Sequence, residues 1–244
     1  MARSIYIASP SAGAGKSTVA LGLIVCLTKV VAKVGVFRPF VDSRDEDPFL
    51  NLLLARSGSA TPAAQCIGVT WDEYHAAPEE SLSRIVDAYR AVARDHDVVI
   101  IDGSDFTDVA GTPELDLNAR VAANIGVPVL LVVSGRDAPE DVRASVEVSV
   151  AEIAENHART VAVIANRCPA ATRGEVAAAL SGIEGLTVTT LPEVPLLSAP
   201  SVREIADAVK GTLIAGDGAL LEREAEGVLV AAMDVSHVLE RLAE

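Results

Sequence analysis

The sequence predicts an α/β fold in which a parallel sheet lies between two layers of helices. Strand-like and helical patterns alternate along most of the 244 residues, an order that favours parallel strands joined by helical crossovers. Half of the residues are hydrophobic and only 3% are aromatic, so the core must be aliphatic, which suits strands buried on both faces. A Gly-Lys-Ser run stands between the first strand and the first helix, where a phosphate-binding loop is expected.

The individual elements follow from unbroken apolar runs, helical periodicity and turn residues. Residues 97–101 and 127–133 are apolar runs short enough to be buried strands, whereas residues 79–94 carry their apolar side chains on one helical face. Pro48 suits the first turn of a helix. In chain order we expect a strand at 4–8, a helix at 16–31, a strand at 34–37, helices at 48–56 and 79–94, strands at 97–101 and 127–133, a helix at 137–155, a strand at 161–165, a helix at 172–180 and a strand at 187–191.

A proline-rich segment at residues 191–200 separates these elements from a short tail. Its three prolines can continue neither a helix nor a central strand. The tail is expected to contain a helix at 202–209, strands at 212–214 and 227–231, and a final helix from residue 236. Fewer than about 50 residues are too few to hold a core of their own, so we expect the chain to belong to a longer polypeptide. The predicted domains are residues 1–197 and an incomplete, partial α/β segment at 198–244.

Composition excludes two classes of partner. Twenty basic and 34 acidic residues give a net charge of −14, so a basic surface for nucleic acid is not expected and an anionic membrane would repel the chain. The three cysteines are scattered without metal-ligand spacing, which is typical of a reducing compartment. Because a strand and a glycine-rich turn begin at the N-terminus, a signal peptide is not expected and the predicted location is the cytoplasm.

The glycine-rich turn is the strongest functional signal. Small residues let backbone N–H groups converge on phosphate oxygens, and a helix N-terminus adds partial positive charge. The expected nucleotide-binding residues of this loop are Ser11, Ala12, Gly13, Ala14, Gly15, Lys16, Ser17 and Thr18. Lys16 would reach the β- and γ-phosphates and Ser17 would ligate Mg²⁺, and such a lysine is expected to make few contacts in the empty site. The alternative is a tight strand-to-helix turn with a solvated lysine, and Pro10 removes one N–H donor from the loop.

A second signal is Asp102, which directly follows the apolar run at 97–101. Nucleotide sites place a magnesium-binding carboxylate at such a strand end, and Asp105 could assist from the next loop. The alternative is an ordinary turn aspartate, since Asp-Gly-Ser-Asp is also good turn chemistry. Asp47, from the acidic loop at 42–47, is the third expected magnesium ligand beside Ser17 and Asp102.

Two further residues stand at strand ends. Arg38 could hold a phosphate or a carboxylate in bidentate fashion, or it could pair with the aspartates that follow it. Asn166 could read an adenine edge, although asparagine in a loop is usually a turn former. The four histidines, His75, His96, His157 and His237, form no metal-binding pair in the sequence and are interpreted as surface or structural residues.

These segments together resemble a known family. IYIASPSAGAGKST, KVGVFRPF, VVIIDGSD and ANR are similar to the dethiobiotin-synthetase-like P-loop family. Their order resembles the N-terminal region of long-form bacterial phosphate acetyltransferase, particularly the actinobacterial type. The tail from VREIADAVKG to LERLAE is similar to the start of the DRTGG domain in that enzyme.

The resemblance implies a nucleotide-binding regulatory region, with acetyl transfer between acetyl-CoA and phosphate performed by a C-terminal domain of the same polypeptide. It further implies ATP or another nucleotide with Mg²⁺ as cofactor and assembly into a homo-oligomer. The alternative is an active ATP-dependent ligase of the dethiobiotin synthetase or cobyrinate amide synthase type. Arg38 and the Asp-Gly-Ser-Asp run at 102–105 replace a lysine and a Glu-Gly-Ala-Gly-Gly run of dethiobiotin synthetase. A partitioning ATPase is disfavoured because Ser11 occupies the position of that family's signature lysine.

Overall fold

The computed structural model describes residues 3–45, 47–104, 114–225, 234, 235, 237 and 239. It divides into two compact units, Met1–Glu193 and Val194–Glu244. The predicted domain boundary after residue 197 lies four residues beyond this division.

The first unit is built on a seven-stranded sheet in which all neighbouring strands are parallel. The strands are β1 (Arg3–Ala8), β2 (Val34–Val41), β3 (Ile67–Thr70), β4 (Val98–Asp102), β5 (Val129–Ser134), β6 (Thr160–Cys168) and β7 (Thr187–Pro192). Their order across the sheet is β3-β2-β4-β1-β5-β6-β7. The strand that leads into the P-loop, β1, therefore lies between β4 and β5, so the carboxyl ends of these three strands meet at one edge.

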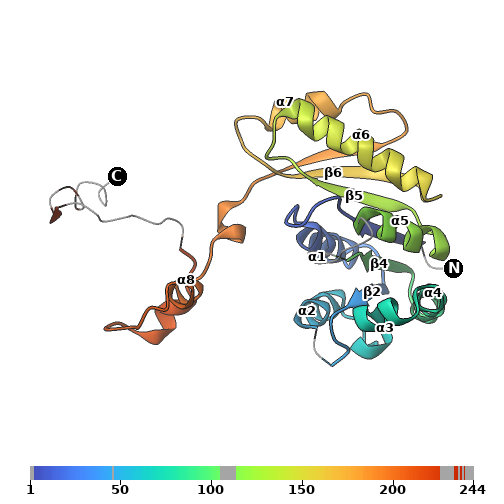
Figure 1. The fold of residues 1–244 in the computed structure, drawn as a ribbon, viewed down its shortest axis with the longest axis horizontal. Coiled ribbons are helices and arrows are strands. Elements are labelled where there is room, and N and C mark those ends of the chain that lie inside the picture. The colour runs from blue at the N-terminus through green and yellow to red at the C-terminus, as the bar shows by residue number, and fades with distance from the viewer. Residues whose placement is uncertain are drawn as a thin grey trace. The chain divides into compact units, whose positions relative to one another are not determined.

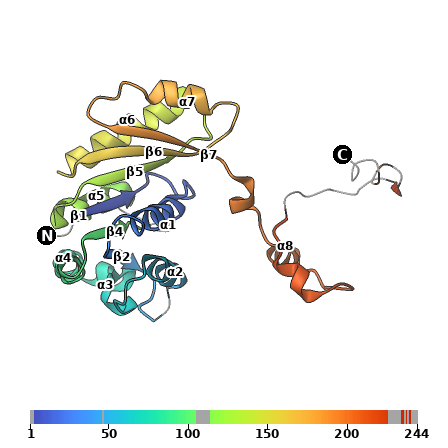
Figure 2. The ribbon, with the colours of Figure 1, turned by 180° about the vertical axis from the view of Figure 1, so that it is seen from behind.

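Helices cover both faces of this sheet. They are α1 (Lys16–Leu27), α2 (Pro48–Ser57), α3 (Trp71–Ala76), α4 (Pro78–Arg94), α5 (Glu114–Ile125), α6 (Pro139–Glu155) and α7 (Arg173–Leu180). Helices α1 and α2 lie on one side of the sheet and α4 and α5 on the other, as Figures 1 and 2 show. Helix α6 packs beside α5, and α7 beside α6. The predicted three-layer α/β fold is thus confirmed.

The buried core is aliphatic, as the composition predicts. Strands β4 and β5 contribute side chains that are almost completely buried, among them Ile100, Ile101 and Leu131. The amphipathic helix α4 buries the face carried by Leu82, Ile85 and other apolar residues. In the part of the chain that the structure describes, no helix combines the length and the apolar character needed to cross a membrane.

Several expected boundaries differ from the structure. Helix α1 ends at Leu27 with Thr28 as its C-cap, rather than at residue 31, and β2 continues to Val41 instead of ending at residue 37. The strand expected at 212–214 is wrong, because residues 212–214 pair with no strand in the part of the chain that the structure describes and Ile214 is 97% exposed. The expected strand at 227–231 and most of the final helix lie outside the described residues.

Among the α-helices and strands of the described residues, three were not predicted: β3, α3 and α5. The short helix α3 begins with a capping box, in which Thr70 and Glu73 exchange side-chain and backbone hydrogen bonds. Trp71 opens this helix and stacks on Phe40 of β2, with ring centroids 4.5 Å apart. This contact anchors the edge of the sheet at β3.

Glu73 also forms ion pairs with two arginines, and these should make the stability of the fold depend on pH. Its carboxylate accepts hydrogen bonds from Arg84 at 2.7 Å and from Arg44 at 2.8 Å. The Arg84 bond, then the Thr70 N–H and Arg44, lower the pKa of Glu73 to about 2. Because the folded-state pKa lies below the unfolded one, the stabilisation is present above about pH 4.5 and is lost as the pH falls towards 2.

We therefore expect Glu73→Gln to lose stability relative to wild type at pH 6 but to match it closely near pH 2. The difference should be at most about 1 kcal/mol, since the pairs are partly exposed. Urea unfolding midpoints measured at both pH values test this. Glutamine can still form the hydrogen bonds of the capping box. An equal loss of stability at both pH values would therefore show that the charge of Glu73 is not the cause.

The second unit, taken alone, contains little regular structure. Helix α8 (Val202–Ala208) has its own capping box, formed by Ser201 and Glu204. A single antiparallel bridge joins Ser201 to Glu224, and Arg203 pairs with Glu222 at 2.5 Å. Among its described residues none is fully buried. This is consistent with the expectation that the tail is too short to form a core.

Candidate functional site

The predicted P-loop connects the carboxyl end of β1 to the N-terminus of α1. Gly13 and Gly15 have φ angles of 76° and 83°, in the left-handed region that favours glycine. The Ser9 hydroxyl donates to the Ser11 carbonyl at 2.8 Å and holds the start of the turn. The first hydrogen bond of the helix runs from the Val19 N–H to the Gly15 carbonyl, so the amide groups of the first turn lie ahead of it and face the loop.

Lys16 is buried at the base of this loop and bound to the end of β4. Its ammonium group donates to Asp102 Oδ1 at 2.7 Å and to the Gly103 carbonyl at 2.5 Å. Lys16 is 2% exposed and Asp102 is completely buried. Ile7 of β1 pairs with Asp102 of β4, so the loop that follows β1 starts beside Asp102. Lys16 and Asp102 therefore come together, as the order of strands predicts. The expectation that this lysine makes few contacts in the empty site is wrong, because it forms a buried ion pair.

Arg38 extends this charged cluster from β2. One of its terminal nitrogens pairs with Asp47, and its Nε lies 3.5 Å from Asp102 Oδ2. Arg38 Nε and Asp102 Oδ2 are both buried and make no hydrogen bond to the described residues. The sequence leaves two interpretations of Arg38 open, binding of a ligand anion and pairing with aspartates. In the structure Arg38 pairs with aspartates.

Asp47 has a local structural role as well. It is the N-cap of α2, and its Oδ1 accepts the Leu50 N–H at 2.8 Å. Its other oxygen is taken by Arg38. Both carboxylate oxygens are therefore engaged, and Asp47 would have to release one of them to bind Mg²⁺.

Two residues near the carboxyl end of β6, which continues past the expected end at residue 165, support the loop from the other side. Asn166 donates its side-chain N–H to the Ala14 carbonyl at 2.9 Å, and Arg167 donates to the Gly13 carbonyl at 2.6 Å. A Cβ at Gly15 would lie 2.3 Å from Asn166 Nδ2. Asn166 thus contacts the loop itself; its expected role toward adenine stays a prediction.

A buried hydrogen-bond network that the sequence analysis missed lies behind Asp102. The Tyr6 hydroxyl donates to Asn118 Oδ1 at 2.6 Å, and the Ser104 N–H donates to the same oxygen at 3.0 Å. Burial, and then the charges of Asp102 and Glu114, raise the pKa of Tyr6 well above its usual value, so its hydroxyl stays a hydrogen-bond donor. The network links β1, the loop after β4 and α5, and it fixes the backbone around Gly103.

A polar cavity of about 140 Å³ opens beside the charged cluster. It is lined by Arg38, Phe40, Val41, Asp42, Asp47, Pro48, Trp71 and Ser104. Its position at the carboxyl ends of the strands is where doubly wound folds bind ligands.

The structure therefore brings together most of the predicted site. Ser17 and Thr18 lie in the first turn of α1, next to the cluster of Lys16, Asp102 and Arg38. Asp105 lies outside the described residues. Among the residues that are described, no cluster of three or more His, Cys, Asp or Glu side chains is arranged to hold a metal ion, so magnesium binding by Ser17, Asp47 and Asp102 stays a prediction.

Comparison with known proteins agrees with the resemblance noted in the sequence. Over its whole length the chain is 26% identical to phosphate acetyltransferase of Nitratidesulfovibrio vulgaris and 25% identical to that of Synechocystis sp.. Phosphate acetyltransferase of Salmonella typhimurium is 24% identical over 61% of the chain. The chain spans 37% of the length of the first two relatives and 22% of the third. The expected resemblance is confirmed.

Solved structures and a family match show the fold. A McdA variant from Cyanothece in complex with ATP is 16% identical, with a TM-score of 0.52 over 91% of this chain and 93% of that one. The signal recognition particle receptor FtsY from Elizabethkingia anophelis is 19% identical, with a TM-score of 0.51 over 78% of this chain and 58% of that one. Residues 3–201 match the family described as an AAA domain. These residues include the P-loop, Lys16 and Asp102, and the chain therefore belongs to the AAA domain family.

Proposed function

We propose that this chain is the nucleotide-binding regulatory part of a phosphate acetyltransferase and that acetyl transfer belongs to another part of the same polypeptide. The observation that carries the proposal is the buried pair of Lys16 and Asp102 at the base of a P-loop, in a chain similar over its whole length to 37% of two phosphate acetyltransferases. The C-terminal domains of that polypeptide are the expected partners, with a homo-oligomer in the cytoplasm and a role in acetate metabolism.

The residues present fit a nucleoside phosphate. The positive φ angles at Gly13 and Gly15 curve the backbone so that the loop faces the N-terminus of α1, which is an arrangement that binds phosphate oxygens. Lys16 supplies a cation at its base, and Arg38 Nε is a buried donor that makes no hydrogen bond to the described residues. These groups would hold the phosphates.

Magnesium fits less completely. Asp102 Oδ2 is buried without a hydrogen bond to the described residues, and a carboxylate oxygen beside a serine hydroxyl is a donor set that Mg²⁺ accepts. Ser17 and Asp102 would therefore hold the ion, which would neutralise charge on the bound phosphates. Asp47 would join them only after releasing Arg38 or the N-terminus of α2.

The ligase alternative requires a second substrate beside the phosphates. The 140 Å³ cavity lined by Arg38 and Trp71 has the right position, but Arg38 stands where the resemblance places a lysine in dethiobiotin synthetase. We therefore favour binding without ligation. ADP release in the presence of diaminopelargonate and bicarbonate would favour the ligase instead.

Thermal unfolding with and without nucleotide tests the proposal. A ligand present at a hundred times its dissociation constant stabilises by about 2.7 kcal/mol, and each kcal/mol raises the melting temperature of a domain this size by roughly 2–4 °C. Saturating Mg-ATP or another nucleotide should therefore raise it by several degrees. Lys16→Ala should abolish this shift relative to its own ligand-free melting point, whereas Lys29→Ala, at an exposed lysine after α1, should keep it. If ATP, GTP and their diphosphates all leave the wild-type curve unchanged, the proposal fails.

A further inference from the structure

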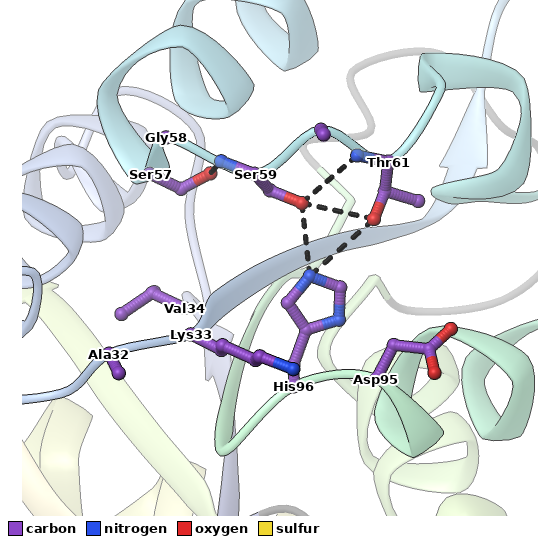
Figure 3. A pocket seen from close by; sticks show the side chains of 10 residues that line it. Ala32, Lys33, Val34, Ser57, Gly58, Ser59, Thr61, Asp95 and His96 are labelled. Atoms are coloured by element: carbon purple, nitrogen blue, oxygen red, sulfur yellow. Dashed lines mark hydrogen bonds between the residues drawn. The ribbon is translucent and has the colours of Figure 1, made fainter.

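A second cavity lies at the opposite edge of the sheet from the P-loop. It has a volume of about 320 Å³ and is shown in Figure 3. Val34 begins β2 and His96 shortly precedes β4, so the cavity adjoins the amino ends of these strands. It is lined by Ala32, Lys33, Val34, Ser57, Gly58, Ser59, Ala60, Thr61, Asp95 and His96.

The imidazole of His96 is held in one orientation. Its Nδ1 lies 2.7 Å from the Val92 carbonyl in the last turn of α4. A carbonyl oxygen only accepts hydrogen bonds, so Nδ1 carries the proton and Nε2 of the neutral ring is left as an acceptor. The ring also packs closely against β2, because a Cβ at Gly35 would lie 2.7 Å from it. His96 therefore presents a basic nitrogen in a fixed position.

That nitrogen faces the hydroxyl of Ser59. His96 Nε2 lies 3.0 Å from Ser59 Oγ and 3.5 Å from Thr61 Oγ1, and the two hydroxyl oxygens are 3.0 Å apart (Figure 3). The Thr61 N–H donates to Ser59 Oγ at 3.2 Å. The Ser59 hydroxyl has one proton and two acceptors within reach, Thr61 Oγ1 and His96 Nε2. Since Nε2 can only accept, Ser59 donates to it when the Thr61 hydroxyl rotates to donate to Ser59 Oγ, and the Thr61 N–H also supports that oxygen. The backbone at Ser59 is held as well, because the Ser59 N–H donates to Ser57 Oγ at 3.2 Å.

We propose that Ser59 is a nucleophile activated by His96 and that the cavity binds an activated acyl compound, such as an ester with a good leaving group. A hydroxyl, a base within hydrogen-bond reach and a third group that orients the base are the parts that nucleophilic catalysis requires. In this chain the Val92 carbonyl orients His96. Serine hydrolases use a carboxylate in that role.

The covalent step balances with the groups present. Ser59 Oγ attacks the acyl carbon and forms a new C–O bond, while its proton passes to His96 Nε2. The bond between the acyl carbon and the leaving group breaks, and the leaving group takes the electron pair and then the proton. Lys33 lines the same cavity and supplies positive charge near the oxyanion that develops on the carbonyl oxygen.

The 244-residue chain treated with p-nitrophenyl acetate tests this inference. We expect release of p-nitrophenolate together with acetylation of the peptide that contains Ser59, detected by mass spectrometry. Ser59→Ala should abolish this site-specific reaction. His96→Asn should slow it by roughly 100-fold or more, the size of a general-base contribution. Asparagine can keep the bond to the Val92 carbonyl, and thermal unfolding confirms that each variant is folded.

Matched variants separate this reaction from background acetylation. Ser181→Ala and His75→Asn, at an exposed serine and an exposed histidine, should leave the rate unchanged, and Thr61→Val should retain most of it. Equal rates in wild type and Ser59→Ala, acetylation confined to lysines, or loss of reaction in Thr61→Val but not in Ser59→Ala would each overturn the assignment. If His96→Asn does not fold, the comparison of wild type with Ser59→Ala decides by itself. The result is independent of nucleotide binding, which takes place at the other edge of the sheet.

Discussion

Replacing Lys16 with alanine is expected to destabilise the ligand-free chain by about 3–5 kcal/mol, the cost of leaving a buried charge without its partner. Lys16 is 2% exposed and donates to both Asp102 and the Gly103 carbonyl. Its removal leaves the Asp102 carboxylate buried, with Arg38 Nε at 3.5 Å as the nearest remaining cation described. At roughly 2–4 °C for each kcal/mol, the melting temperature should fall by about 6–20 °C.

A double-mutant cycle identifies the pair as the cause. Lys16→Met fills the same space without the charge, and Asp102→Asn removes the partner charge. Each single change should destabilise strongly, and the double variant should be much less unstable than the sum of both because no unpaired charge is left. Lys29→Ala, at an exposed lysine, should change stability by less than about 0.5 kcal/mol. Additive losses in the cycle, measured by chemical unfolding, would show that Lys16 and Asp102 do not act as a pair.

The sheet was predictable because its central strands carry strong local signals. Strands β4 and β5 are unbroken aliphatic runs, and such runs have little alternative to burial between helices. The edge strand β3 has only four residues, one of them Gly68, and a segment so short carries no periodicity of its own. The wrong strand at 212–214 shows the same limit, because three residues of high strand propensity, Thr-Leu-Ile, form a strand only where a neighbouring strand pairs with them.

The site was predictable where topology alone determines it. The ends of adjacent parallel strands must meet, so a lysine after β1 and an aspartate at the end of β4 come together. The sequence could not show that they meet as a buried ion pair, because burial depends on how α1 and α2 cover the sheet. It could not show the bond from Tyr6 to Asn118 either, because α5 was not predicted and the two residues are far apart in the chain. His96 and Ser59 share no motif spacing, and they come together only because the folded chain holds the His96 ring between the Val92 carbonyl and Gly35.

Gly103→Ala is expected to destabilise the chain by about 3 kcal/mol, at the upper end of what overpacking a core usually costs. A Cβ at Gly103 would lie 2.5 Å from Asn118 Oδ1, 2.6 Å from the Ile7 carbonyl and 2.7 Å from the Tyr6 ring. The Ile7 carbonyl belongs to β1 and accepts the Gly103 N–H at 3.0 Å, so it cannot move without disturbing the centre of the sheet. The Gly103 carbonyl also accepts a hydrogen bond from Lys16. A backbone shift that relieves the clash should therefore displace the Lys16 ammonium group and lower nucleotide affinity too.

Gly22→Ala in α1 is the matched control: a Cβ there meets nothing within 4 Å, and alanine should stabilise the helix by about 0.5–1 kcal/mol. Chemical unfolding of both variants tests the contrast, and a Gly103→Ala variant as stable as wild type would mean that the backbone at the end of β4 is not held as tightly as these distances require.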